Sequence, residues 1–222
     1  MKLALFDLDG TLLPGDSDHA FGEFVIAQGW ADADAHRAGN NAFYLQYQSG
    51  TLDIAAYVRF CTAPWRDRPA AEIEAARRRF LREVIVPELR EPALALVQRH
   101  REAGDLVAIV TATNDFVTRP IAELFGVPTL IATELERDGS GRFTGAIRGT
   151  PAFREGKIVR VHEWLAALGR RLSDFEQSCF YSDSPNDLPL MELVSHPVAT
   201  NPVAPLREAA LARGWPILEL FK

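Results

Sequence analysis

The residues best suited to chemistry in this chain are two carboxylates near its start, Asp7 and Asp9. They end a short apolar run, residues 3–6, that is typical of a buried strand, and they are followed by Gly10 and Thr11. A charge at the edge of a core is costly without a partner, and carboxylate oxygens are suitable ligands for Mg²⁺. One carboxylate could bind the metal and attack phosphorus while its neighbour moves protons. An Asp-Gly pair alone would indicate only a turn, but the complete string favours a catalytic site.

Further polar groups stand where other strands are expected to end or helices to begin: Thr111, Lys157, Asp183, Asn186 and Asp187. The carboxyl ends of parallel strands meet at one edge of a sheet, where open α/β folds form their sites. Taken singly, Thr111 could cap a helix, Lys157 could be solvated and Asp183 could be a turn residue. Their joint order along the chain is more informative than any one of them.

The elements that would position these groups alternate after about residue 89. Apolar runs typical of strands are separated by segments with helical periodicity. Strands are expected at 106–110, 129–136, 142–147, 178–181, 197–200 and 215–218, and helices at 91–103, 114–125, 155–168, 186–194 and 203–212. The turn at 138–141 predicts a hairpin whose second strand is antiparallel. This alternation predicts an α/β fold, a doubly wound parallel sheet with helices on both faces.

The segment between the acidic pair and this α/β region has a different pattern. From about Ser17 to Val86 there is no strand pattern, and apolar residues recur at helical spacing between Gly and Pro stops. We therefore expect residues 1–14 and 89–222 to form the core and residues 15–88 to be an inserted all-helical domain. Pro120 must lie early in the helix expected at 114–125 or kink it.

The composition of the chain disfavours nucleic-acid binding and a membrane-spanning helix. The chain has 222 residues, of which 47% are hydrophobic and 24% charged, as is ordinary for a globular protein. The net charge of −6 disfavours a nucleic-acid surface, and the basic run Arg77–Arg79 is expected to be a solvated helix face. No apolar run approaches the ~20 residues of a membrane helix. Cys61 and Cys179 stand far apart, so a reduced cytoplasmic protein without a membrane partner is expected.

Taken together, four motifs resemble those of the haloacid dehalogenase-like (HAD) hydrolase superfamily. They are Asp7-Leu-Asp9-Gly10-Thr11, the strand-terminal Thr111, Lys157 in Arg154-Glu-Gly-Lys157, and Tyr181-Ser-Asp183-Ser-Pro-Asn186-Asp187. The helical insertion between the first two motifs is similar to the cap of the phosphoserine phosphatase-like branch. The resemblance implies a Rossmann-type core with a mobile helical cap, and a phosphatase acting on phosphomonoesters.

The resemblance also implies roles for these residues. Asp7 would be the nucleophile that becomes an aspartyl-phosphate. Asp9 would protonate the leaving alkoxide and then deprotonate the attacking water, a role that is worth about 10²–10⁴ in rate. Thr111 would donate a hydrogen bond to a phosphoryl oxygen, and Lys157 would neutralise charge.

Mg²⁺ is the cofactor that the resemblance implies. It would bind the carboxylates of Asp7 and Asp183 and the backbone carbonyl of Asp9, while Asp187 would orient its waters. Such a set provides the positioning and charge stabilisation that phosphoryl transfer requires.

Four residues are candidates for binding the substrate: Asp16, Arg59, Ala112 and Asn186. The branch usually has Gly-Gly after the second-motif residue, where this chain has Ala112-Thr113. Asp16 stands where the branch binds a substrate amine, although Asp16 could also simply cap a helix.

The cap also differs from the branch where a substrate carboxylate would bind. The branch has an arginine there, whereas a rough match places Cys61 or Thr62 at that position, and the nearest arginine is Arg59. The resemblance therefore favours a small phosphate ester with an amine and without a carboxylate. Histidinol phosphate is the first candidate of this kind.

Other functions stay open at this point. A phosphoserine phosphatase, another small-molecule phosphatase and a phosphotransferase of the same superfamily all fit the motifs, because water and an alcohol can both accept a phosphoryl group. Response-regulator receivers also combine an acidic pair with a Thr and a Lys, but they are roughly half this length and have no helical cap. Dehalogenases lack the second carboxylate of the first motif, so Asp9 argues against them.

Overall fold

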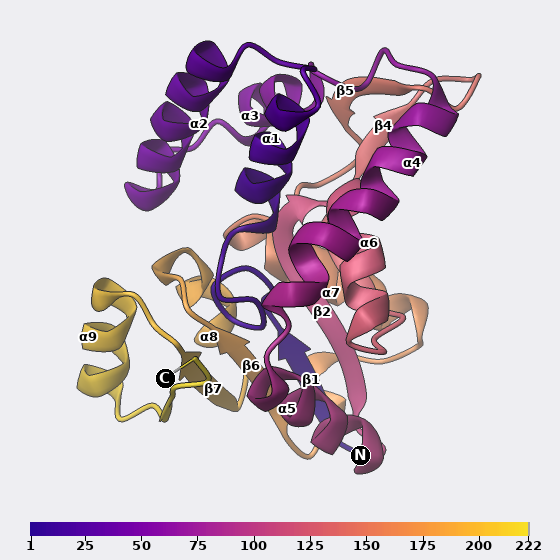
Figure 1. The fold of residues 1–222 in the computed structure, drawn as a ribbon. Coiled ribbons are helices and arrows are strands. Elements are labelled where there is room, and N and C mark those ends of the chain that lie inside the picture. Colours follow the sequence, from indigo (N-terminus) through magenta and orange to yellow (C-terminus); the bar gives the residue numbers. More distant parts are fainter. Residues whose placement is uncertain (222) are drawn as a thin grey trace.

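A six-stranded parallel sheet forms the centre of the molecule, in a computed structural model that describes residues 1–221 (Figure 1). The strand order is β3-β2-β1-β6-β7-β8. The strands are β1 (Leu3–Phe6), β2 (Leu106–Asn114), β3 (Leu130–Thr133), β6 (Ser178–Ser182), β7 (His196–Thr200) and β8 (Ile217–Leu218). The expected doubly wound parallel sheet is confirmed.

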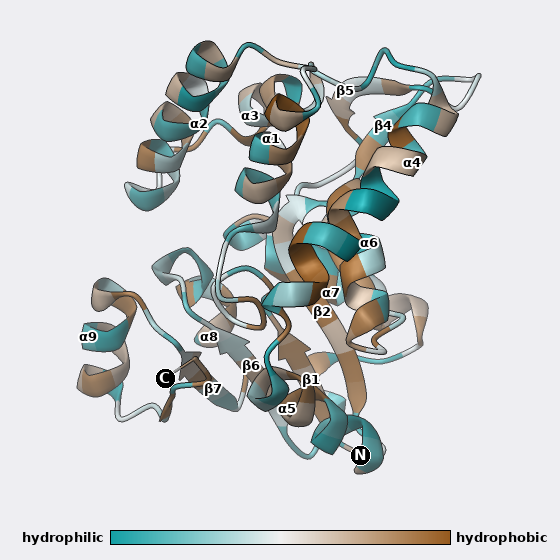
Figure 2. Ribbon diagram, viewed as in Figure 1, coloured by the Kyte–Doolittle hydropathy of each residue, from teal (hydrophilic) through white to brown (hydrophobic). Residues whose placement is uncertain are grey.

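Helices cover both faces of this sheet. One face carries α5 (Glu91–Glu102) and α6 (Asp115–Leu124), and the other carries α7 (Glu155–Ala167), α8 (Leu188–Met191) and α9 (Ala204–Arg213). The side chains of β1 alternate between the two layers: Ala4 and Phe6 pack on the α5 side, and Leu3 and Leu5 on the α7 side. Because both faces are covered, β1 and residues 106–110 of β2 are apolar along their length (Figure 2).

The order of the strands places a crevice at the end of β1. The chain passes from β1 to β2 and β3 on one side, and the later strands β6, β7 and β8 lie on the other side of β1. β1 and β6 are direct neighbours, with Phe6 opposite Tyr181. The residues that follow these two strands therefore meet at the switch point where open α/β sheets bind ligands.

The regular secondary structure within residues 17–88 is all helical, as expected. The helices are α1 (Ser17–Ala27), α2 (Ala33–Gln48), α3 (Ile54–Thr62) and α4 (Ala70–Phe80), followed by a π-helical turn at Leu81–Ile85 and a 3₁₀ turn at Val86–Glu88. α1, α2 and α3 lie beyond the end of the sheet toward which β1 points, and α4 leads back to the sheet (Figure 1).

The expected strand at 129–136 is two strands in different sheets. Residues up to Thr133 form β3, whereas β4 (Leu135–Arg137) pairs antiparallel with β5 (Phe143–Ile147). The hairpin predicted from the turn at 138–141 is confirmed. It packs against the helical segment, since the Trp65 ring lies 5.1 Å from that of Phe143.

Pro120 lies in the second turn of α6, so it neither starts nor ends the helix. A proline there leaves the carbonyl four residues earlier without its helical partner. Arg77 of α4 supplies the missing donor, because its Nη1 lies 3.2 Å from the carbonyl oxygen of Phe116. The expectation of a fully solvated arginine face is thus wrong for Arg77, while Arg78 and Arg79 are exposed.

Candidate active site

Asp7 lies in a buried ion-pair network at the carboxyl end of β1. Lys157 Nζ, at the start of α7, is 2.8 Å from Asp7 Oδ1 and 2.8 Å from Asp187 Oδ2. Burial raises the pKa of Asp7 to about 6, although Lys157 opposes this rise. Burial alone would lower the pKa of Lys157, but the carboxylates of Asp187 and Asp7 outweigh it and raise that pKa. Lys157 is therefore held as a cation between two carboxylates.

Asp183 faces Asp7 across the crevice between β1 and β6. Thr11 Oγ1 lies 3.1 Å from Asp183 Oδ1 and 3.4 Å from Asp7 Oδ2. The Asp183 N–H also donates to Thr11 Oγ1 at 3.0 Å. Burial raises the pKa of Asp183 well above its usual value, and the charges of Asp7 and Asp187 add to this effect. The two carboxylates on either side of Thr11 thus repel each other.

A divalent cation would relieve this repulsion, and the donor set suits one. In residues 1–221 there is no group of three or more His, Cys, Asp or Glu side chains that could hold a metal ion. The predicted site needs only two such side chains, Asp7 and Asp183, because its third protein ligand is the backbone carbonyl of Asp9. An all-oxygen set with few protein ligands fits Mg²⁺, which usually retains several waters.

Asp187 is buried beside Lys157. Its carboxylate accepts from Lys157 and, at 2.7 Å, from the hydroxyl of Ser182. Asp187 therefore helps to hold Lys157, and its role in orienting metal-bound waters stays a prediction.

The carboxylate of Asp9 is held at both of its oxygens. The backbone N–H of Ser17 donates to Oδ1 at 2.7 Å, and the hydroxyl of Thr113 donates to Oδ2 at 2.8 Å. Burial raises the pKa of Asp9 to about 8, and the charge of Asp16 contributes. A carboxyl group that retains its proton near neutral pH can act as a general acid.

β2 continues past its expected end at residue 110 and runs to Asn114. Its register with β3 shifts between Val110 and Asn114. Thr111 is buried and accepts the N–H of Thr113 at 3.2 Å, while its hydroxyl donates to no other residue within the range 1–221. That donor is available for a phosphoryl oxygen. Ala112 is half-buried between the two threonines.

Three predicted substrate-binding residues lie where the helical segment meets the core or at its surface. Asp16 is exposed and caps α1, accepting from the N–H groups of Asp18 and His19 at 2.9 Å each. Arg59 is exposed on α3, and none of the ion pairs or hydrogen bonds among residues 1–221 involves its guanidinium. Asn186 is buried, and its Nδ2 donates to the backbone carbonyl of Tyr47 at 3.0 Å.

One residue that contacts the loop of the acidic pair was not predicted from the sequence. Asn201, at a positive φ of 47°, donates from Nδ2 to the carbonyl oxygens of Gly10 at 3.2 Å and Thr11 at 3.1 Å. It thereby fixes the loop that carries the acidic pair. The Asn-Pro dipeptide after the strand expected at 197–200 is a turn signal that could have indicated it.

Asp18 is a further buried carboxylate that lies outside the predicted site residues. It is 6% exposed and accepts from Asn114 Nδ2 at 3.1 Å. Burial raises its pKa from 3.8 to about 7, and the charge of Asp16 adds to the rise. The folded state therefore holds the proton of Asp18 more strongly than the unfolded chain does, and this favours folding most at low pH.

We expect Asp18→Asn to change the pH dependence of stability. In the wild type, stability from this group falls as the pH rises from about 4 to about 7 and is constant above that. The free energy of unfolding of Asp18→Asn relative to wild type should therefore increase across this window, by up to roughly 4 kcal/mol. Urea unfolding at pH 4.5, 6 and 8 measures it. A difference between Asp18→Asn and wild type that does not vary with pH would contradict the prediction.

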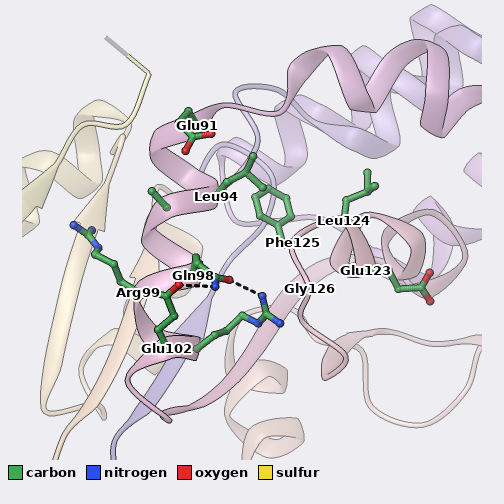
Figure 3. Close-up of a pocket in the computed structure, with 11 residues that line it drawn as sticks. Glu91, Leu94, Gln98, Arg99, Glu102, Glu123, Leu124, Phe125 and Gly126 are labelled. Carbon is green, nitrogen blue, oxygen red and sulfur yellow. Dashed lines mark hydrogen bonds between the residues drawn. The ribbon is translucent and has the colours of Figure 1, made fainter.

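A surface pocket of about 490 Å³ lies elsewhere, between α5 and the end of α6 (Figure 3). Three of its polar side chains pair with one another: Gln98 donates to Glu102 at 2.8 Å and accepts from Arg101 at 2.6 Å. None of the predicted site residues lines it. Separately, within residues 1–221 no helix combines the length and the apolar character that crossing a membrane requires.

Several known proteins are similar to this chain in sequence and in fold. The sequence model of the family described as haloacid dehalogenase-like hydrolase matches residues 4–192. A histidinol-phosphatase of Neisseria meningitidis serogroup C (strain 8013) is 45% identical over 217 residues, covering 98% of each chain. A solved structure from Bordetella pertussis Tohama I has a TM-score of 0.93 at 49% identity and covers 99% of each chain. The structure of a substrate-bound phosphoserine phosphatase has a TM-score of 0.69 at 19% identity, and the match covers 100% of this chain and 93% of that one. This match shows that the two proteins have a similar fold.

The chain therefore belongs to the haloacid dehalogenase-like hydrolase family. Within this family it is a phosphatase, as the motifs led us to expect.

Proposed function

We propose that this protein is a Mg²⁺-dependent phosphomonoester hydrolase that acts through an aspartyl-phosphate on a small amine-bearing metabolite, with histidinol phosphate favoured. The observation that carries the chemistry is the buried Asp7, which has Lys157 on one oxygen and faces Asp183 across Thr11. The substrate choice is supported by the relative from Neisseria meningitidis, which is named for that reaction. Two free cysteines, Cys61 and Cys179, are consistent with a reduced cytoplasmic setting.

In the proposed reaction Asp7 attacks phosphorus and Asp9 protonates the leaving alkoxide. Asp9 then accepts a proton from the water that hydrolyses the aspartyl-phosphate. Bound Mg²⁺, held by Asp7, Asp183 and the Asp9 carbonyl, would lower the charge repulsion between the phosphate ester and the carboxylates. The Thr111 hydroxyl donates to a phosphoryl oxygen, and the Lys157 cation stays fixed beside Asp7, so that no side chain has to reorganise as charge develops.

We infer that residues 15–88 act as a cap over a core of residues 1–14 and 89–222. The end of α2 contacts the loops that carry the site. The Tyr47 hydroxyl donates to Ser184 Oγ at 3.0 Å, and Arg154 Nη1 donates to the Gly50 carbonyl oxygen at 2.8 Å. A cap closed in this way would exclude bulk water and restrict the substrate to small molecules.

We expect Tyr47→Phe to weaken this closure. It removes one hydrogen bond, worth about 0.5–1.5 kcal/mol, so KM should rise by roughly 2- to 10-fold. Steady-state kinetics on the best substrate measures it. Tyr44→Phe is the matched control, since Tyr44 lies on the same helix and is 50% exposed. Equal kinetics for both variants and wild type would count against the cap contact.

The favoured substrate follows from the charges beside Asp9. Asp16 raises the pKa of both Asp9 and Asp18, so its carboxylate acts on both groups. A substrate ammonium would be stabilised in this acidic region. A substrate carboxylate would be repelled there unless Arg59 paired with it, and an unpaired buried charge costs several kcal/mol. This favours an amino alcohol phosphate over phosphoserine.

A panel of phosphomonoesters with Mg²⁺ tests the proposal. We expect kcat/KM to be highest for histidinol phosphate, with phosphate released in the absence of any acceptor alcohol. Comparable values of kcat/KM for phosphoserine would contradict the inference that the site disfavours a substrate carboxylate. A requirement for an acceptor alcohol would indicate a phosphotransferase.

Asp16→Asn provides a sharper test of amine recognition. Asparagine caps helices about as well as aspartate, so α1 should be preserved while the charge is lost. We expect KM for histidinol phosphate to rise about 10-fold, as for the loss of one partly solvated ion pair, and KM for p-nitrophenyl phosphate to stay unchanged. Asp32→Asn, at the cap of α2, should change neither value. An unchanged KM for histidinol phosphate would assign Asp16 to helix capping alone, and a parallel rise for both substrates would contradict a specific role in amine recognition.

A further inference from the structure

The extension of β2 beyond its expected end brings an unpredicted hydroxyl group to Asp9. Thr113 is the second residue after Thr111, and its Oγ1 lies 2.8 Å from Asp9 Oδ2. The hydroxyl of Thr113 has no other hydrogen-bond partner within residues 1–221, whereas its N–H donates to Thr111 Oγ1 at 3.2 Å. The side chain of Thr113 is thus directed at the carboxylate of Asp9 alone.

We propose that Thr113 is a positioning residue for the general acid: its hydroxyl sets the plane of the Asp9 carboxyl group and so the direction of proton delivery. The proposal rests on the proposed function in one respect, the role of Asp9 as the acid.

Rotation of a carboxyl group about its Cβ–Cγ bond is only weakly restricted by its own torsional preference. One hydrogen bond to one oxygen leaves this rotation open, and the Ser17 N–H supplies such a bond to Oδ1 at 2.7 Å. The Thr113 hydroxyl holds the other oxygen, and it comes from β2 in the sheet, while Ser17 begins α1. Two donors on two oxygens, from two separate elements, define the plane of the Asp9 carboxyl group.

The hydrogen bonds also restrict where the transferred proton resides. A carboxylate has about four lone-pair positions. The Ser17 N–H occupies one on Oδ1, and the Thr113 hydroxyl occupies one on Oδ2. In the first step an Asp7 oxygen bonds to phosphorus while the bond from phosphorus to the leaving alkoxide oxygen breaks, and that oxygen takes the proton that Asp9 carries on a lone pair not used by Ser17 or Thr113. In the second step a water proton passes to Asp9, the remaining hydroxide oxygen bonds to phosphorus, and the bond from phosphorus to Asp7 breaks, which restores the Asp7 carboxylate. Thr113 donates throughout and exchanges no proton.

This role predicts a specific dependence on the leaving group. A misdirected acid slows the departure of an alkoxide, which needs a proton, much more than that of p-nitrophenolate, which leaves without one. We expect Thr113→Val to lower kcat/KM for histidinol phosphate, or for the best alkyl phosphate of the panel, by about 10- to 100-fold. The value for p-nitrophenyl phosphate should change by less than about 3-fold, and Thr113→Ser should restore most of the loss.

The control is Thr118→Val. Thr118 is a fully buried threonine whose hydroxyl donates to the Asn114 carbonyl oxygen at 2.8 Å and not to Asp9. A purely structural loss in this region should slow both substrates equally, as Thr118→Val would. An equal loss for both substrates in Thr113→Val, a failure of Thr113→Ser to rescue, or an unchanged alkyl rate would each overturn the proposal.

The Asp9→Asn background separates this proposal from the role of Asp9 itself. If Asp9 is the acid, Asp9→Asn alone should show the same selective loss on the alkyl ester, and adding Thr113→Val should have little further effect. Activity near wild type in Asp9→Asn would refute the acid role and the proposed mechanism. A full additional loss from Thr113→Val in that background would refute only the positioning by Thr113.

Discussion

We expect Asp7→Asn to reduce turnover by roughly 10⁴-fold or more while the fold persists, as for the removal of a catalytic nucleophile. Asparagine has nearly the same shape as aspartate, but it cannot form an acyl phosphate with the substrate. The substitution also removes one of the carboxylates that repel each other around Thr11. Thermal unfolding should therefore show a folded protein, because the relief of this repulsion offsets part of the loss of the Lys157 contact at 2.8 Å.

The intermediate itself can be trapped in the wild type. Rapid quenching during turnover, followed by borohydride reduction, should convert Asp7 to homoserine, which mass spectrometry of the peptide detects. Asp105→Asn is a matched control, because the Asp105 carboxylate is 7% exposed and pairs with His100 just before β2, at the end of that strand away from the site. Near-wild-type turnover by Asp7→Asn, or reduction at a different residue, would overturn the covalent mechanism.

We expect Gly10→Ala to impair the acidic site by displacing one of its carboxylates. Gly10 has a φ of +75°, and a Cβ there would lie 2.3 Å from Asp183 Oδ2 and 2.6 Å from Asp183 Cγ. The positive φ alone costs about 1–2 kcal/mol for an alanine. The clash must also move the Asp183 carboxylate, and a displacement of about 1 Å near reacting groups can cost 10²-fold in rate.

The measurement for Gly10→Ala is activity as a function of Mg²⁺ concentration. If Asp183 is a metal ligand, the half-saturating concentration should rise and activity at saturation should fall by roughly 10²-fold. Gly15→Ala is the control in the same loop, because its added Cβ would meet no atom within 4 Å and it has no strained φ. A Gly10→Ala variant with unchanged metal dependence would remove Asp183 from the metal site.

The sequence predicted those parts of the site that depend on strand ends. Asp7 and Asp183 follow apolar runs, and neighbouring parallel strands must end at one edge, so their proximity follows from the pattern alone. Lys157 was found only through its order relative to these motifs. A lysine near a helix start carries no local signal that it will be buried between two carboxylates.

The contacts that depend on exact strand length could not be predicted. The end of β2 was expected at residue 110, and three or four more residues decide whether Thr113 reaches Asp9. Apolar periodicity does not report such an extension, because the added residues Thr111 and Thr113 are polar. The contact of Tyr47 with Ser184 joins residues far apart in the sequence, and it depends on how the helical segment packs against the core.

Residues 15–88, which we propose to be an inserted cap, are not an interchangeable module in this structure. Trp65 of this segment stacks on Phe116 of α6 at 4.6 Å and meets the edge of Phe143 of β5 at 5.1 Å. A chain without the insertion would expose both of these rings to water, together with the apolar surface around them. Transplanting the insertion into another member of the family should therefore succeed only if the β4–β5 hairpin is transplanted with it.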